Sequence, residues 1–214
     1  MKLDVVCMKV GTGYKHEFVN QLFHQVKHQV NNFTCWTDNP RGFDQNINVY
    51  EYKSFCMDRL WWNKVNLFEP GLFTNDTIYL DLDCYVHGQL NDFIGTGQIL
   101  QTTWFSNDIN KYIFNCDVNS SILYLKDNNF EDQYKDFQDN KEKVFKSFYG
   151  LDGWMYRRHR DKLKFFPSKL AYSYKYGSSF PDDLDDYKKR DDHAVACFDD
   201  VEDKHETLKT FWGD

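Results

Sequence analysis

The stretch Thr77–Asp83 (TIYLDLD) indicates the fold most directly. It contains no charged side chain before Asp81, and we predict a strand over Thr77–Asp81. A strand that is apolar along its whole length is typical of a central position in a sheet covered on both faces. In open α/β sheets, ligands bind at the carboxyl ends of the strands. Asp81 and Asp83 would therefore stand where a binding site is expected.

Strands and helices alternate in the residues before this stretch. Apolar residues recur at helical spacing through residues 16–30, and residues 47–52 alternate as a strand does. The predicted elements are strands over Leu3–Val10, Phe33–Thr37 and Ile47–Tyr52, and helices over His16–Val30 and Asp58–Leu67. Such alternation predicts a layered α/β fold.

The second half of the chain is less regular. We predict strands over Ile99–Phe105 and Ser121–Leu125, a helix over Phe130–Phe148 and an acidic loop over Phe180–Asp203. Of the adjacent Trp61 and Trp62, at least one ring is expected in the core. No internal repeat, low-complexity tract or linker divides the sequence, which favours one domain over residues 1–214.

Composition narrows the class of protein. The 214 residues suffice for one full core, and 18% aromatic residues favour a packed globular fold. The formal net charge of -7 disfavours general nucleic-acid binding. The six cysteines form no CxxC pair, so buried thiols in a reducing compartment are favoured over disulfides or zinc. No apolar run of about 18 residues predicts a membrane span, and Asp4 interrupts any signal peptide. We expect a cytoplasmic protein, in the host cytoplasm if it is viral.

Three predicted strand ends carry glycine or polar residues, at Gly11–Gly13, Thr37–Asp38 and Asp81–Asp83. In a parallel sheet they would converge on one crevice. Two carboxylates at positions i and i+2 of a strand point the same way and can reach one hard cation. Magnesium or manganese there would bridge the phosphates of a nucleotide diphosphate. Two aspartates that merely begin a turn would give the same pattern, but the apolar strand before them favours the metal site.

The residues around these aspartates resemble a known family. Ile78–Val86, followed by Gly88 and Leu90, is similar to the DxD strand of GT-A glycosyltransferases, above all the glycogenin-like family eight and its phage and bacterial relatives. Further segments resemble the family in the same order: Val5–Gly11 with Tyr14, Phe33–Pro40, Trp61–Val65, Phe114–Leu123, Leu151–Met155 and Ser173–Lys175. The resemblance covers nearly the whole chain.

This resemblance implies a single GT-A (Rossmann-like) α/β domain with a central, mostly parallel mixed sheet flanked by helices. Residues 1–90 would form the nucleotide-binding half that ends in the DxD motif, and residues 91–214 the sugar and acceptor half. The implied function is metal-dependent transfer of a sugar from a nucleotide-sugar, with UDP-sugar as the favoured donor, to a glycan, a protein or another hydroxyl acceptor. Similarity to family eight favours retention of configuration.

The resemblance also assigns roles to residues. Asp81 and Asp83 would hold Mn²⁺ or Mg²⁺, and the donor would contact Lys9, Gly11, Tyr14, Thr37, Asp38, Lys64, Asp81, Leu82, Lys204 and His205. Asn119 and Asp152 would face the transferred sugar as catalytic residues. A carboxylate at Asp152 would stabilise the positive charge that develops in glycosyl transfer. The alternative for Asp152 is an ordinary loop aspartate in a turn over residues 150–153.

One segment departs from the family pattern. The family closes its site with a segment of the type HFHGKPKPH, and the matching stretch here is Cys197–His205. Asp199 takes the place of the metal-binding histidine and would be the third metal ligand. Asp200 and Val201 replace the glycine and lysine that hold the diphosphate. Either the metal neutralises this cluster, or Lys204 and His205 take over, or the alignment slips by a few residues; otherwise tight donor binding has been lost.

Three other functions remain open. The departure at residues 199–201 motivates a non-catalytic nucleotide- or sugar-binding protein that kept the GT-A fold. A haloacid-dehalogenase-type phosphatase would need threonine or valine where Tyr85 stands, and its motif would follow the first strand. A nucleotidyltransferase would need a basic glycine-rich loop, whereas Gly11–Gly13 is flanked only by Lys9 and Lys15.

Overall fold

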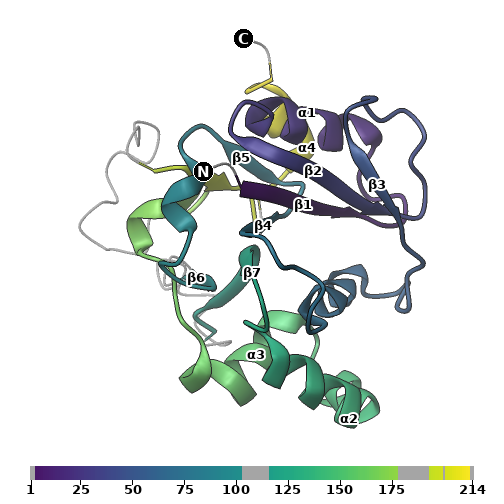
Figure 1. Cartoon of the computed structure of the whole chain (residues 1–214), viewed down its shortest axis with the longest axis vertical. Coiled ribbons are helices and arrows are strands. Elements are labelled where there is room, and N and C mark those ends of the chain that lie inside the picture. Colours follow the sequence, from purple (N-terminus) through teal and green to yellow (C-terminus); the bar gives the residue numbers. More distant parts are fainter. Residues whose placement is uncertain (1–2, 103–115, 178–192, 200, 213–214) are drawn as a thin grey trace.

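Six strands form the main sheet of the computed structural model, which describes residues 3–102, 116–177, 193–199 and 201–212. Their order across the sheet is β3–β2–β1–β4–β7–β6 (Figure 1). The strands are β1 (Leu3–Lys9), β2 (Val30–Thr37), β3 (Asn48–Glu51), β4 (Thr77–Leu80), β6 (Ile99–Gln101) and β7 (Val118–Leu125). Strands β3, β2, β1 and β4 are parallel, and β7 runs antiparallel to both β4 and β6. The predicted mixed, mostly parallel sheet is confirmed.

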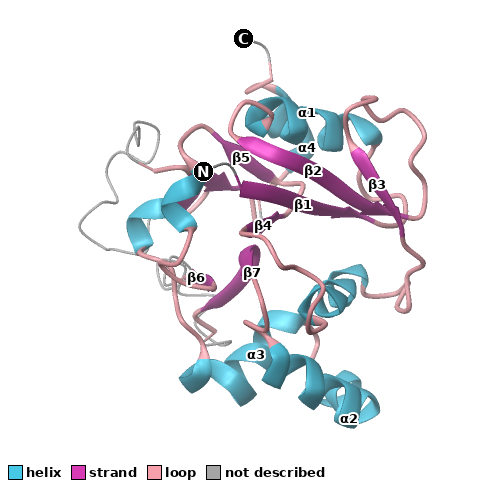
Figure 2. Ribbon diagram, in the orientation of Figure 1, coloured by secondary structure: helices cyan, strands magenta, loops and turns pink. Residues whose placement is uncertain are grey.

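Strand β4 lies inside the sheet, between β1 and β7, and all four of its residues are buried. Helices cover both faces of the sheet (Figure 2): α1 (His16–Val26) on one, and the 3-10 helix η1 (Leu60–Phe68), α2 (Glu131–Ser147) and α3 (Leu151–His159) on the other. Neighbouring residues of β1 point to opposite faces, so Val5 and Cys7 pack with α1 while Val6 packs with η1 and α3.

A second sheet stands beside the end of β4. Its order is β5–β9–β8, with strands β5 (Cys84–Val86), β8 (Ala171–Ser173) and β9 (Val195–Cys197). The backbone of Phe198 donates to the carbonyl of Asp83 at 3.0 Å, and α4 (Lys204–Lys209) follows. This small sheet therefore carries the last part of the chain to the two aspartates.

Several predicted bounds were wrong. The first helix ends at Val26 rather than Val30, because Val30 already pairs with Leu3 as part of β2. The second is a 3-10 helix, and β7 begins three residues before the predicted strand. Strand β9 lies within the predicted acidic loop, whose residues 180–192 are outside the described ranges, as are residues 103–105 of the strand predicted over Ile99–Phe105.

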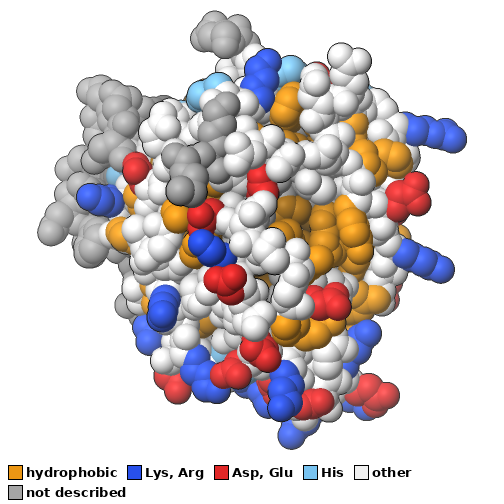
Figure 3. Space-filling model, in the orientation of Figure 1, with side chains coloured by type: hydrophobic (Ala, Val, Ile, Leu, Met, Phe, Trp, Pro, Cys, Tyr) orange, Lys and Arg blue, Asp and Glu red, His pale blue; other side chains and the backbone are white. Residues whose placement is uncertain are grey.

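The remaining helical segments are short, and many charged side chains are visible at the end of the molecule formed by α2 and α3 (Figure 3). The 3-10 helices η2 (Leu90–Phe93), η5 (Arg160–Lys162) and η6 (Ser168–Leu170) connect the longer elements. Lysine, arginine and acidic side chains crowd the end of the molecule formed by α2 and α3 (Figure 3). All six cysteines are free thiols. No helix in the described ranges has the length and apolar character needed to cross a membrane.

Candidate functional site

Asp81 follows β4 directly, and both of its carboxylate oxygens are bound by neighbouring side chains. Lys64 of η1 donates from Nζ to Oδ2 at 2.6 Å, and the Tyr79 hydroxyl donates to Oδ1 at 2.5 Å. Lys64 also donates to the backbone oxygen of Ser120 at 3.3 Å. Burial raises the pKa of Asp81, and the positive charge of Lys64 opposes that effect. The ion pair ties η1, β4 and β7 together at one point.

Asp83 receives its partners from both ends of the chain. Its Oδ2 accepts hydrogen bonds from the Tyr14 hydroxyl at 2.9 Å and from Lys204 Nζ at 2.7 Å. Burial opposes ionisation of Asp83, but the charge of Lys204 and the two hydrogen bonds outweigh burial and lower its pKa. Its Oδ1 receives no hydrogen bond from the described residues. Asp83 is therefore ionised, with one oxygen free of protein donors from that part of the chain.

Asp199 lies beyond β9 and faces the same cluster. Its Oδ2 accepts from Asn119 Nδ2 at 2.9 Å, and its Oδ1 accepts from the Ser121 hydroxyl at 3.2 Å. Burial, together with the negative charges of Asp83 and Asp81, raises the pKa of Asp199 to about 7. The three predicted metal ligands are thus close enough for their charges to act on one another.

The type of these ligands suits a divalent cation, but their present contacts do not. Three carboxylates are what a hard cation prefers, and the raised pKa of Asp199 indicates that the cluster lacks positive charge. Within the described ranges, however, no three His, Cys, Asp or Glu side chains are arranged to hold a metal ion. The ammonium groups of Lys64 and Lys204 instead bind one oxygen of each DxD aspartate. A cation on either aspartate would therefore lie next to an ammonium group.

The two predicted catalytic residues lie on either side of Ser120. Asn119 belongs to β7, and its Oδ1 accepts the backbone N–H of Ser121 at 2.9 Å. Asp152 lies in the first turn of α3, and its Oδ1 accepts the backbone N–H of Ser120 at 3.1 Å. Burial raises the pKa of Asp152, and Lys64 opposes that effect. Asp152 therefore lies in a helix, not in the turn expected over residues 150–153.

A hydrogen bond joins the loops that follow β1 and β2. The backbone N–H of Gly11 donates to Asp38 Oδ2 at 2.9 Å. Gly11 has a φ of +72°, and a side chain there would meet Leu60. Thr37 is buried, and its hydroxyl bonds to the backbone of Asn39 at 3.0 and 3.1 Å, so it stabilises this turn. These contacts hold together the loops that follow the carboxyl ends of β1 and β2.

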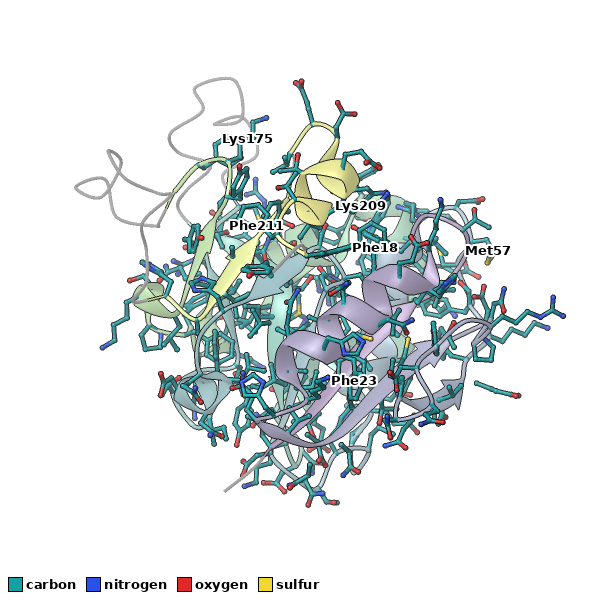
Figure 4. All side chains as sticks on the ribbon, turned by 90° about the horizontal axis from the view of Figure 1, so that it is seen from above. Phe18, Phe23, Met57, Lys175, Lys209 and Phe211 are labelled. Carbon is teal, nitrogen blue, oxygen red and sulfur yellow. The ribbon has the colours of Figure 1, made fainter. Side chains whose placement is uncertain are left out.

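The remaining predicted donor-binding residues differ in position. Lys9 ends β1 and is buried. Leu82 packs into the core on the α1 side, which leaves only its backbone for a ligand. His205 packs against Tyr14 and Phe18, with ring centroids 4.8 and 4.7 Å apart, rather than standing alone on the surface. Figure 4 shows Phe18 of α1 next to α4. Burial lowers the pKa of His205, and the charge of Lys204 adds to this effect.

Sequence reasoning missed Tyr79, Ser120 and Ser121 as members of the site. Each had a signal in the sequence. Tyr79 stands two residues before Asp81, on the same side of an otherwise apolar strand. Asn119, Ser120 and Ser121 are three polar residues in β7, whose eight residues are all buried. Buried polar side chains need partners, and here the partners are the site carboxylates and Lys64.

Solved structures with a similar backbone identify the fold. A scan against protein-family models and a search of curated proteins gave no match. The galactosyltransferase LgtC, solved in complex with donor and acceptor sugar analogs, matches 99% of this chain and 95% of its own, with a TM-score of 0.62 and 14% identity. A glycosyltransferase involved in glycosylation of the PBCV-1 major capsid matches 97% of this chain and 98% of its own, with a TM-score of 0.57 and 12% identity. The chain has a GT-A fold.

A third similar structure covers less of its own chain. The apo-form glycosyltransferase GlyE of Streptococcus pneumoniae matches 80% of this chain and 46% of that chain, with a TM-score of 0.54 and 13% identity. The GT-A fold expected from the DxD strand is therefore confirmed. At these identities the likeness concerns the fold, and the activity has to be argued from the site.

Proposed function

We propose that this protein is a metal-dependent glycosyltransferase that moves a sugar from a nucleotide-sugar, with a UDP-sugar as the favoured donor, to a hydroxyl acceptor with retention of configuration. One observation carries the proposal: Asp81, Asp83 and Asp199 form a charged cluster beyond β4, and Lys64 and Lys204 bind two of them. Carboxylates for a cation and lysines for phosphates are what transfer from a nucleotide diphosphate requires. The GT-A fold supports the same function.

In this proposal Asp81, Asp83 and Asp199 hold Mn²⁺ or Mg²⁺. When bound, the cation stabilises the negative charge on the departing diphosphate. Lys64 favours the ionised form of Asp81 and orients it, because it is buried and bonded to that carboxylate. Lys204 and His205, on α4, supply the donors nearest to the place of the diphosphate.

The nucleoside occupies the rim formed by the loops after β1 and β2. Gly11 allows the close approach of the first loop, and Asp38 fixes it through the Gly11 N–H. Thr37 and Lys9 end the two neighbouring strands, where ligands of α/β sheets bind. Tyr14 closes this side against Asp83, and Leu82 offers its backbone.

The transferred sugar is bound by residues of β7 and α3. Asn119 orients the sugar from β7, and Asp152 faces the anomeric carbon from α3. A carboxylate at that position stabilises the positive charge that develops as the glycosidic bond breaks. The acceptor is a hydroxyl group of a glycan, a protein or another molecule. Retention rests on the resemblance to family eight.

Calorimetric titration of UDP and of GDP, each with and without Mn²⁺, tests the donor site. We expect Mn²⁺-dependent UDP binding to the wild type that is lost in Asp83→Asn. The control is Asp132→Asn, which removes an exposed carboxylate of α2 that pairs with Lys162 at 2.8 Å. Wild-type binding by Asp83→Asn, or no nucleotide binding by the folded wild type, would contradict the proposal.

The transfer step is tested with UDP-sugars and a panel of glycan acceptors. Asp152→Asn should lower kcat by about 10²–10³-fold, as the removal of one group that stabilises the transition state does. The affinity for UDP should stay unchanged. The asparagine oxygen can still accept the Ser120 N–H, so the fold is kept. NMR of the new anomeric centre shows whether configuration is retained.

A second candidate is a nucleotide- or sugar-binding protein without turnover. The observation that favours it is that a lysine ammonium group binds one oxygen of each DxD aspartate, so that a metal there would have to displace these groups or lie beside them. Tight UDP binding in the absence of Mn²⁺, with no sugar release from any donor, would support this alternative over the transferase.

A further inference from the structure

The two lysines of the site are held very differently. Lys64 is buried and makes three contacts: one to Asp81, and two to the backbone oxygen and hydroxyl of Ser120. Lys204 makes one hydrogen bond within the described ranges, to Asp83 at 2.7 Å, and its ammonium lies 5.4 Å from the ring centre of Tyr14. Lys64 is therefore a fixed part of the site, whereas Lys204 is held by one ion pair and by its contact with the Tyr14 ring.

The side chain of Lys204 borders open space into which it can rotate. Its side chain is 35% exposed, while that of Asp83 is 9% exposed. It lines a surface hollow of about 440 Å³ together with Asp203, His205 and Glu206. Helix α4 is only six residues long and begins after Asp203. The ammonium group can leave Asp83 by side-chain rotation, without unpacking the core.

The charge of Lys204 matters because of what it neutralises. Asp83 accepts two hydrogen bonds on the same oxygen, one of them from Lys204. A divalent cation on Asp83 would have to lie next to this ammonium group, and like charges at such short range repel strongly. An incoming diphosphate reverses the balance, because it offers the ammonium group a new anionic partner.

We propose that Lys204 is a built-in counter-ion that occupies the cation's place on Asp83 in the free protein, so that the divalent cation binds tightly only together with the nucleotide diphosphate. The inference rests on the proposed function, which supplies the cation and the nucleotide. Lys204 exchanges one partner for another: it leaves the carboxylate of Asp83 for the phosphates as the metal takes that carboxylate. The two ligands then bind cooperatively, each raising the affinity of the other by the same factor.

The test measures Kd for Mn²⁺ alone, for UDP alone, and for each ligand in the presence of the other, by calorimetry and by the electron paramagnetic resonance of free Mn²⁺. In Lys204→Met we expect Mn²⁺ alone to bind at least about tenfold more tightly than in the wild type, because the competing charge is gone. UDP with Mn²⁺ should bind about tenfold more weakly, because a phosphate partner is gone. Opposite changes for the two ligands are the signature of the exchange.

Three further variants locate the effect. Lys209→Met removes another lysine of α4, which is 36% exposed and pairs with Glu206 at 2.8 Å, and it should behave as the wild type. Lys204→Arg keeps the charge and should keep the weak binding of Mn²⁺ alone. In Asp83→Asn/Lys204→Met, the gain in Mn²⁺ affinity should vanish, because it arises at Asp83.

Two results would overturn the inference alone. The first is an unchanged Mn²⁺ affinity in Lys204→Met while the wild type binds UDP with Mn²⁺. The second is a parallel loss of both ligands with a lower Tm, which would mean that Lys204 only holds α4 in place. If neither the wild type nor any variant bound Mn²⁺ or UDP, the proposed function would fail together with the inference.

Discussion

Lys64 and Asp81 form an ion pair, with 2.6 Å between Nζ and Oδ2, directly after the carboxyl end of β4. Burial lowers the pKa of Lys64, but the negative charges of Asp81 and Asp152 outweigh burial and raise it. The pair lets two opposite charges exist in a largely buried place. It also aims the aspartate of the DxD motif, whose second oxygen is fixed by Tyr79.

Lys64→Met should leave Asp81 as an unpaired buried charge. Removing one partner of a buried ion pair lowers the free energy of unfolding by roughly 3–5 kcal/mol. Urea denaturation at pH 7.5 would measure this loss. The double variant Lys64→Met/Asp81→Asn should recover most of that loss, because no uncompensated charge is left. It should not recover UDP binding. Equal stability of the single and double variants would contradict a paired role for these residues.

Asp199 predicts a fall in stability as pH rises. Its pKa is raised to about 7, against 3.8 for an ordinary aspartate, because of burial and the charges of Asp83 and Asp81. Between these values the folded protein keeps a proton that the unfolded chain releases, so the free energy of unfolding decreases with pH. The free energy of unfolding should fall by on the order of 1–4 kcal/mol between pH 4 and pH 7, and Asp199 should cause no further change above pH 7.

Asp199→Asn cannot ionise and should lack this slope, so it gains on the wild type between pH 4.5 and pH 8. The matched control is Asp117→Asn. Burial opposes ionisation of Asp117, but hydrogen bonds from Arg160 and Gln101 outweigh it and lower its pKa. Because the pKa of Asp117 is lowered, its contribution to stability is lost only as pH falls below the ordinary pKa of an aspartate. The difference in unfolding free energy between Asp117→Asn and the wild type should therefore be constant over pH 5–8. Thermal unfolding across this range measures both.

The adjacent tryptophans of η1 should differ sharply in their contribution to stability. Trp62 is 0% exposed and packs against Phe137 and Trp154, whereas Trp61 is 38% exposed. Trp62→Ala should cost about 3–5 kcal/mol of unfolding free energy through cavity formation. Trp61→Ala should cost about 1 kcal/mol or less. Guanidinium denaturation of the two variants measures both losses. A larger loss of unfolding free energy in Trp61→Ala than in Trp62→Ala would contradict the prediction.

Two glycines of the first loop offer a matched pair. Gly11→Ala places a side chain at φ +72° and 2.9 Å from Leu60 Cδ1, whereas a side chain at Gly13 meets nothing within 4 Å. We expect Gly11→Ala to cost about 1–2 kcal/mol for the left-handed backbone and to weaken UDP binding by displacing the N–H that Asp38 accepts. Gly13→Ala should change neither. Equal UDP affinity in both variants would remove Gly11 from the donor site.

The sequence alone determined the class of fold and placed the two aspartates of the DxD motif at the end of a buried strand. The apolar residues of β4 had to lie between two covered faces, and the aspartates after them had to stand at a strand end. The period of the apolar residues in α1 fixed which face packs on the sheet. These conclusions depend on local patterns, which a single sequence displays.

Tertiary structure alone decided the contacts inside the site. Lys204 and Asp83 are 121 residues apart, and they meet because β9 pairs with β5, two strands of three residues too short to show a pattern. The same pairing places Asp199 against Asn119. Which lysine neutralises which aspartate, and which tryptophan is buried, depends on how separate elements pack, because charge and burial are properties of surroundings that the chain creates only when it folds.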